Sequence, residues 1–276
     1  MQVRSTKTKI VLYLILIFFA LVFIVPIFWM VSSSFKSLEN TLTTELRWFP
    51  EKLHFENYTQ IWRKGNFGRF FMNSTVVAVV ITSGHLLLAS MAGYGLSKFQ
   101  FRGREVIFMF ILSTMMIPFQ VLVIPLFIIV KNFGWIDTYT GLIVPAILTA
   151  FGVFLMRQYI QTIPNAIIDA ARIDGCKEFY IFYRIVLPLA KPGAAALGIL
   201  VFLGTWNNLL WPLVVVNSDK LFTLPLGLTR LAKSEHGVKY NELLSAAVIS
   251  SAPVVAFFLL FQRYYIEGLT IGSVKG

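Results

Sequence analysis

Charged side chains are scarce in this sequence of 276 residues, since Asp, Glu, Lys and Arg make up 13% of it and hydrophobic residues 57%. Soluble domains carry about 25% charged residues. The mean hydropathy is +0.74, and the apolar residues fall in long charge-free runs that a soluble core of periodic helices does not produce. The scarcity of charge therefore excludes a soluble domain and predicts a membrane protein in contact with lipid.

Residues that build metal, redox and catalytic sites are equally sparse. The one cysteine, Cys176, excludes an intrachain disulfide and a cysteine-built metal site, and the three histidines lie far apart. No run shows paired carboxylates, a His-Glu pair at helical spacing, or a nucleophile beside a base. We therefore predict no catalytic residue, no metal and no cofactor in this chain, which excludes a membrane-embedded enzyme.

Two binding signatures are also missing. A phosphate-binding G-x-x-x-x-G-K-[ST] loop does not occur, so any ATP hydrolysis would be done by another polypeptide. The net charge of +11 is spread over every loop and forms no basic stripe, which argues against a nucleic-acid partner.

The apolar residues form six charge-free runs of about the ~17 to 25 residues that cross a bilayer as a helix. They are Ile10–Val31, Phe70–Leu96, Val106–Val130, Tyr139–Met156, Gly193–Val216 and Leu243–Gln262. The first could be a secretory signal, but its 22 residues exceed the usual signal core of about 7 to 15 and favour a retained helix. The sequence predicts an all-α membrane protein: residues 1–69 form a transmembrane helix and an outer segment, and residues 70–276 a five-helix core.

Basic residues near the ends of the runs predict the orientation of the chain. They are Arg4, Lys7 and Lys9 before the first run and Lys98, Arg102 and Arg104 in the short second loop. Short loops rich in Lys and Arg stay in the cytoplasm. Both termini and the long loop at 157–192 are then cytoplasmic.

This long loop has the pattern of two short helices. Pro164 suits the first turn of a helix that continues over Asn165–Arg172, and Gly175 permits a reversal of the chain. The stretch Lys177–Ile185 then carries four aromatic residues. Spacing alone allows two roles, a helix lying on the membrane surface or a knob that docks on a partner.

Several segments resemble the carbohydrate ABC transporter permeases of the MalG type, which are binding-protein-dependent inner membrane components. Asp169-Ala170-Ala171, Asp174-Gly175, Ile185 and Leu187-Pro188 resemble their EAA loop. Phe55–Tyr58, Trp206–Leu213, Gln262–Tyr264, Glu267–Thr270 and Gly272–Gly276 extend the likeness over most of the chain. The family pattern has Glu where this chain has Asp169, and often Ala where it has Cys176.

The resemblance implies a MetI-like bundle whose two cytoplasmic coupling helices insert into a cleft on an ATPase. Asp169, Ala170, Ala171, Asp174 and Gly175 would make or shape that contact. It implies four kinds of partner: a homologous second permease, two copies of the ATPase with its ATP and Mg, an extracytoplasmic sugar-binding protein, and lipid. The implied function is import of a sugar or oligosaccharide by alternating access, in the cell (inner) membrane of a bacterium or archaeon.

Polar and aromatic side chains in the fifth run are candidates for the substrate path: Trp206, Asn207, Asn208 and Trp211. Amides are costly in lipid and therefore face the bundle interior, where uncharged donors and aromatic faces suit a sugar. Bonding between neighbouring helices is the alternative use of such amides. Prolines inside the runs, such as Pro118, Pro125, Pro212 and Pro253, predict kinks.

Two other transporter classes compete with this interpretation. Ion-coupled secondary transport usually needs an ionisable group inside a span, and the runs contain only His85, which as a packed neutral residue would not serve. A permease of the same family for a non-sugar solute is the second alternative.

Overall fold

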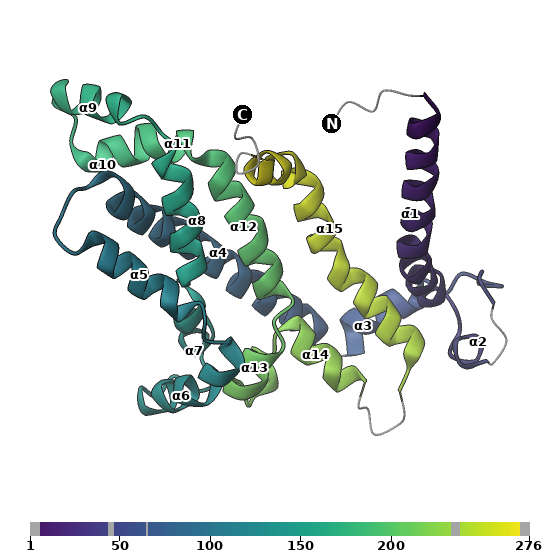
Figure 1. The fold of residues 1–276 in the computed structure, drawn as a ribbon. Coiled ribbons are helices and arrows are strands. Elements are labelled where there is room, and N and C mark those ends of the chain that lie inside the picture. The colour runs from purple at the N-terminus through teal and green to yellow at the C-terminus, as the bar shows by residue number, and fades with distance from the viewer. Residues whose placement is uncertain (1–5, 44–46, 65, 233–237, 271–276) are drawn as a thin grey trace. The chain divides into compact units, whose positions relative to one another are not determined.

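The computed structural model describes residues 6–43, 47–64, 66–232 and 238–270, and every regular element in them is a helix (Figure 1). The predicted all-α fold is confirmed. The predicted basic residue Arg4 and the motif Gly272–Gly276 lie outside the described residues. The chain divides into two compact units, Met1–Phe67 with Leu228–Ala252, and Gly68–Gly227 with Pro253–Gly276.

The first unit contains α1 (Thr6–Ser34), α2 (Leu38–Leu42), α3 (Glu56–Lys64) and the first turns of α15 (Tyr240–Thr270). Most apolar side chains of α1 are exposed, as expected of a helix that faces lipid. Its last carbonyls are not left unpaired. The oxygen of Ser34 accepts hydrogen bonds from Asn57 Nδ2 at 2.8 Å and Ser245 Oγ at 2.9 Å, which anchors the end of α1.

The second unit is built around the long helix α4 (Phe67–Lys98), against which shorter helices are arranged (Figure 1). They are α5 (Arg104–Thr114), α6 (Phe119–Asn132), α7 (Tyr139–Ile143), α8 (Ala150–Gln161), α12 (Lys191–Trp206) and α13 (Leu210–Val215). A 3-10 turn, η3 (Asp219–Leu221), leads into α14 (Leu224–Leu231). Asn73 Nδ2 on α4 donates to Lys220 O at 3.0 Å and Phe222 O at 2.9 Å, which holds this last connection on α4.

Three described helices, α1, α4 and α15, are long and apolar enough to span a membrane on their own. Three further pairs of helices are each bent at a short break. The described residues contain up to six spans if each bent pair counts as one. The third, fourth and fifth predicted runs are each broken into two helical segments, and the kink predicted at Pro118 in the third run is confirmed.

Proline accounts for two of the breaks. The third run turns by 100° between α5 and α6, where Pro118 stands directly before α6. The fourth bends by 44° between a segment ending in the 3-10 turn η1 (Val144–Ala146), which contains Pro145, and α8. Proline donates no backbone hydrogen bond and disfavours helix at the residue before it. Pro125 and Pro253 lie inside continuous helices.

Asparagine marks the break in the fifth run. Asn207 Nδ2 donates to Leu203 O at 3.0 Å, beside its own backbone N–H at 3.1 Å, and α12 ends at Trp206. Asn208 Oδ1 accepts from Trp211 N at 3.2 Å and so begins α13. Side-chain bonds of this kind replace the helical ladder. The helical partner with which α12 forms a bent pair long enough to be one span is therefore not α13. It is the preceding segment Glu178–Leu189, and the two meet at an angle of 78°.

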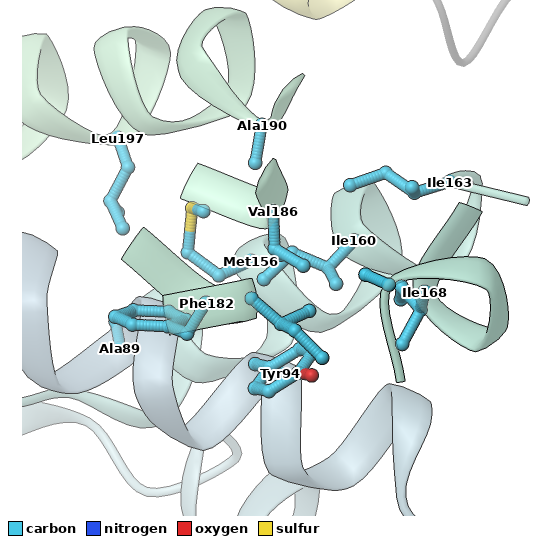
Figure 2. Close-up of a cluster of buried hydrophobic side chains, with 12 residues drawn as sticks. Ala89, Tyr94, Met156, Ile160, Ile163, Ile168, Phe182, Val186, Ala190 and Leu197 are labelled. Carbon is cyan, nitrogen blue, oxygen red and sulfur yellow. The ribbon is translucent and has the colours of Figure 1, made fainter. Parts of the chain in front are cut away.

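The core of the second unit lies beneath the loop at 157–192. Figure 2 shows its side chains, which come from α4, α8, α12 and the loop itself. Met156, Ile160, Ile181 and Val186 are completely buried in it. The loop is therefore packed against the spans rather than tethered beside them.

Candidate functional site

The loop contains α9 (Asn165–Ile173) and α10 (Glu178–Ile181), joined by a sharp reversal. Gly175 has φ +76°, a left-handed conformation that glycine adopts without strain. Cys176 N donates to Ala171 O and Gly175 N to Arg172 O, each at 3.0 Å. This pair of bonds is the Schellman motif that closes helix C-termini. The predicted turn at Gly175 is confirmed, while Pro164 precedes α9 instead of lying in its first turn.

After α10 the chain continues through a five-residue π-helix, Phe182–Val186, and the short α11 (Leu187–Leu189). Phe182 and Val186 are buried in this stretch. A π-helix shifts the register of the buried face within one continuous helical segment. The second half of the loop therefore runs as a single bent rod into α12.

One face of α9 packs on the core and the other is open. Ile168 and Ala171 are buried, whereas Asp169 and Ala170 are exposed. The exposed surface continues over Asp174 and Gly175, and it includes large apolar side chains that are exposed to between 42% and 86%. These are Ile167, Ile173, Phe179, Tyr180 and Tyr183, of which Ile173 is 86% exposed. Exposed apolar clusters of this kind mark contact surfaces with a protein or a membrane.

A charged cluster joins α9, α10 and α4. Arg172 Nε donates to Glu178 Oε1 at 2.7 Å, and Arg172 Nη1 donates to Asp169 Oδ1 at 3.2 Å. The other oxygen of Glu178 accepts from the hydroxyl of Tyr94 on α4, also at 2.7 Å. The cluster fixes the angle between the two loop helices and ties them to a span.

Arg172 favours the ionised form of the Glu178 carboxyl. The hydrogen bond from Arg172 holds the pKa of the Glu178 carboxyl below its ordinary value. A carboxylate with a lowered pKa stabilises the fold above its unfolded pKa, and this contribution is lost as the pH falls through the lowered value. Since Arg172 and Glu178 keep 35% and 40% of their side chains exposed, the pair contributes only about 0.2–1 kcal/mol. Its main effect is geometric.

Lys98, the last residue of α4, adds a second tie to the loop. Its ammonium group donates to Asn165 Oδ1 at 2.9 Å and to the carbonyl of Ile163. The ammonium lies where the chain enters α9, so a movement of α9 is passed directly to the end of α4.

A further ion pair links α8 to the start of α5. Arg157 Nη2 lies 2.8 Å and 3.0 Å from the two carboxylate oxygens of Glu105, and Arg157 Nε donates to Leu96 O at 3.2 Å. The guanidinium also lies 3.7 Å from the ring centroid of Phe108. Arg157 thereby holds three elements together at the end of the bundle that carries the loop.

The four substrate-path candidates occupy different places. Trp206 is buried and stacks on Phe202, with ring centroids 5.6 Å apart. Asn207 is exposed, and its amide bonds to its own helix. Only Asn208 and Trp211 line a cavity, and Trp211 Nε1 donates to Gly141 O at 3.0 Å. The structure brings Asn208 and Trp211 together at this cavity, and Trp206 and Asn207 do not line it.

Sequence reasoning missed several of these residues. The Tyr94–Glu178 and Arg157–Glu105 contacts belong to no local motif, because the two partners in each lie more than 50 positions apart in the chain. Arg157 and Glu105 did stand beside the ends of predicted spans, where a charge needs a partner. Within the described residues no group of three or more His, Cys, Asp or Glu could hold a metal ion.

A helical bundle with up to six spans and a rigid two-helix loop at one end defines a membrane-embedded permease subunit. The sequence model of the "Binding-protein-dependent transport system inner membrane component" matches residues 85–270, and the chain belongs to this family. Its members are ABC importer permeases and are not themselves enzymes.

Two curated relatives match most of the chain. The arabinooligosaccharides transport system permease protein AraQ of Bacillus subtilis is 42% identical over 271 residues, covering 97% of this chain and 96% of the relative. The sn-glycerol-3-phosphate transport system permease protein UgpE of Yersinia enterocolitica is 34% identical over 221 residues, covering 78% and 79%.

A solved structure has the same fold. A chain of a bacterial ABC transporter involved in the import of the acidic polysaccharide alginate superposes with a TM-score of 0.86. It is 24% identical, and the match covers 96% of this chain and 100% of that one. The predicted MetI-like permease fold is confirmed.

Proposed function

We propose that this chain is the permease subunit of an importer that carries an oligosaccharide into the cell by alternating access. The strongest support for the cargo is the relative that transports arabinooligosaccharides, because it is similar over nearly the whole length of both chains. A cavity lined by one uncharged amide, two hydroxyls and aromatic rings suits such a cargo.

The loop Pro164–Pro192 is the docking site for a separate ATPase subunit. One observation carries this proposal: the loop is rigid and packed on the spans, yet it presents Asp169, Ala170 and a cluster of apolar side chains to the outside. A loop packed firmly on the spans can transmit a displacement of the ATPase to them, whereas a flexible loop cannot. ATP and Mg would be held by the ATPase, and closing of the ATPase would move α9 and, through Lys98 and Tyr94, α4.

The acidic contact to the ATPase would come from Asp169. Its carboxylate is exposed but already bonded to Arg172, so a basic residue of the partner would share or displace that bond. Ala171 packs inward and Ala170 outward, so Ala170 is the alanine that would touch the partner. Asp174 and Gly175 shape the turn between the two helices.

The remaining partners follow from the family. A homologous second permease would form the path together with this chain, and two ATPase copies would bind the two loops. An extracytoplasmic binding protein would deliver the sugar on the opposite side of the cell membrane. Both termini are then cytoplasmic.

Co-purification tests the assignment. The chain is expressed with its neighbouring permease and ATPase, purified in detergent and reconstituted, and ATPase activity is measured with binding protein loaded with a panel of sugars. We expect an ATPase to co-purify and at least one oligosaccharide to stimulate hydrolysis. If no ATPase co-purifies, the docking proposal is wrong.

Import of glycerol 3-phosphate is the second candidate, because UgpE is also similar to this chain. That likeness is weaker and covers less of the chain than the likeness to AraQ. Stimulation by glycerol 3-phosphate alone, with none by any oligosaccharide, would replace the proposed cargo.

A further inference from the structure

The three broken runs of the second unit meet at one cavity of about 380 Å³. Phe119 is the first residue of α6 after one break, Thr149 lies in the break before α8, and Asn208 lies in the break after α12. His85 on the continuous helix α4 completes the lining. Irregular backbone within a membrane protein is tolerated where it is buried in protein or lines a cavity, so the breaks and the cavity have a common explanation.

The size of the cavity fits a small molecule, since binding sites span about 300–1,000 Å³. An adjoining hollow of about 20 Å³ shares Thr205, Asn208 and Trp211 with it and is lined by Thr223. That volume is enough for one water molecule. The two spaces together offer a larger site for a ring and a smaller one for a bridging water.

Polar atoms at this site lack partners within the described part of the chain. Thr223 Oγ1 and His85 Nδ1 are buried and make no hydrogen bond there. Asn208 Oδ1, which also faces this region, accepts a hydrogen bond from Trp211 N. Buried polar groups are nearly always satisfied, so unpaired ones beside a cavity indicate a missing ligand or water.

The lining carries no Lys, Arg, Asp or Glu. An anionic or cationic ligand would lose its hydration here without meeting an opposite charge. Hydroxyl groups, in contrast, would find the hydroxyls and amide of Thr149, Thr205 and Asn208, and the faces of a ring would find the aromatic side chains of Phe119, Phe151 and Trp211.

We propose that this cavity is a subsite for one uncharged, hydroxyl-rich sugar ring of the transported chain. The inference rests on the proposed function and adds the place and the chemistry of binding. Its wall is formed by residues of α4, α6, α8, α12 and α13, and α6 and α13 lie at the opposite end of the second unit from α9 and α10 (Figure 1). With the loop in the cytoplasm, the subsite is at the outer end, where a delivered sugar arrives first.

Gly204 offers a direct test, because it lines the cavity and a Cβ added there meets no atom within 4 Å. Substitutions at this helical position therefore fill the cavity without disturbing the fold. Uptake of labelled arabinotriose is measured in vesicles holding the complete importer with Gly204→Ala, Gly204→Val and Gly204→Leu. We expect the KM for arabinotriose to rise with side-chain size, by at least about ten-fold for Gly204→Leu.

Leu213→Phe is the matched control, because it adds bulk to an exposed side chain of α13 outside the cavity. Its KM should equal that of the unsubstituted chain. Equal KM and kcat in Gly204→Leu and the unsubstituted chain would overturn the subsite while leaving the importer intact. Failure of the unsubstituted chain to take up any tested oligosaccharide would instead overturn the proposed function.

Thr205→Val covers the case in which Gly204→Leu does not assemble. The substitution keeps the shape of the side chain and removes one hydroxyl from the cavity wall. A lost hydrogen bond to the sugar raises the KM by about five-fold. An unchanged KM in Thr205→Val, combined with unchanged affinity in the assembled Gly204 variants, contradicts the proposal.

Discussion

Gly175 holds the sharpest backbone turn of the loop. Its left-handed φ of +76° costs a residue with a Cβ about 1–2 kcal/mol, although a Cβ there would meet no atom within 4 Å. The glycine is therefore required by backbone geometry and not by close packing. Its N–H also closes α9 by bonding to Arg172 O.

We expect Gly175→Pro to abolish sugar uptake while the chain still inserts in the membrane. Proline fixes φ near −65° and removes the N–H, so the angle between α9 and α10 changes while the spans are untouched. Gly175→Asn is the control, since asparagine tolerates the left-handed region and should keep most of the activity. Uptake and sugar-stimulated ATPase activity in vesicles measure both variants. Normal uptake by Gly175→Pro would show that the turn does not couple the two subunits.

At the scale of elements, the loop is joined to three spans by different kinds of contact. The buried side chains of α9 and the π-helix pack on α8, while Tyr94 and Lys98 tie the loop to α4. α12 follows directly after the bend at Leu189. A displacement of α9 is therefore distributed over several helices at once.

Arg157 stabilises the same end of the bundle through its ion pair with Glu105. We expect substitutions of the two members of this pair to differ in their effect on stability. Its side chain is 8% exposed and contacts a carboxylate, a carbonyl and a ring, whereas Glu105 is 59% exposed and can be hydrated. Arg157→Gln should lower the free energy of unfolding by about 2 kcal/mol, and Glu105→Gln by less than about 1 kcal/mol. Unfolding of the purified chain in mixed micelles measures both. Equal losses would mean that the ion pair alone accounts for the effect.

At the scale of the whole molecule, the loop helices α9 and α10 lie at the opposite end of the second unit from α6 and α13, each of which contributes a residue to the cavity wall (Figure 1). An importer needs this separation, because sugar arrives on one side of the membrane and ATP is hydrolysed on the other. The basic residues near the first two spans predict that the loop lies in the cytoplasm.

Single cysteines test that orientation. In a Cys176→Ser background, a membrane-impermeant maleimide added to intact cells should label Ser218→Cys and should leave Asp174→Cys unlabelled until the cells are permeabilised. Both positions lie outside the helices, so labelling depends on the side of the membrane. The reverse pattern would invert the predicted topology.

The sequence by itself determined the class of the protein and the outline of the loop. Long charge-free runs require helices because lipid offers the backbone no partners, and Gly175 with its helical neighbours required a turn. These features depend on composition and on residues close together in the chain. The ATPase contact and the sugar cargo came from the likeness to a family.

The tertiary structure decided where the helices break and what the breaks form. The charge-free runs continue across Pro118 and Asn207, because a broken span buries the same apolar residues as a straight one. Only packing shows that three breaks meet at one cavity, and that Glu178 is held by Tyr94 from a helix 84 positions earlier. Such contacts depend on the path of the chain in space, which local pattern does not encode.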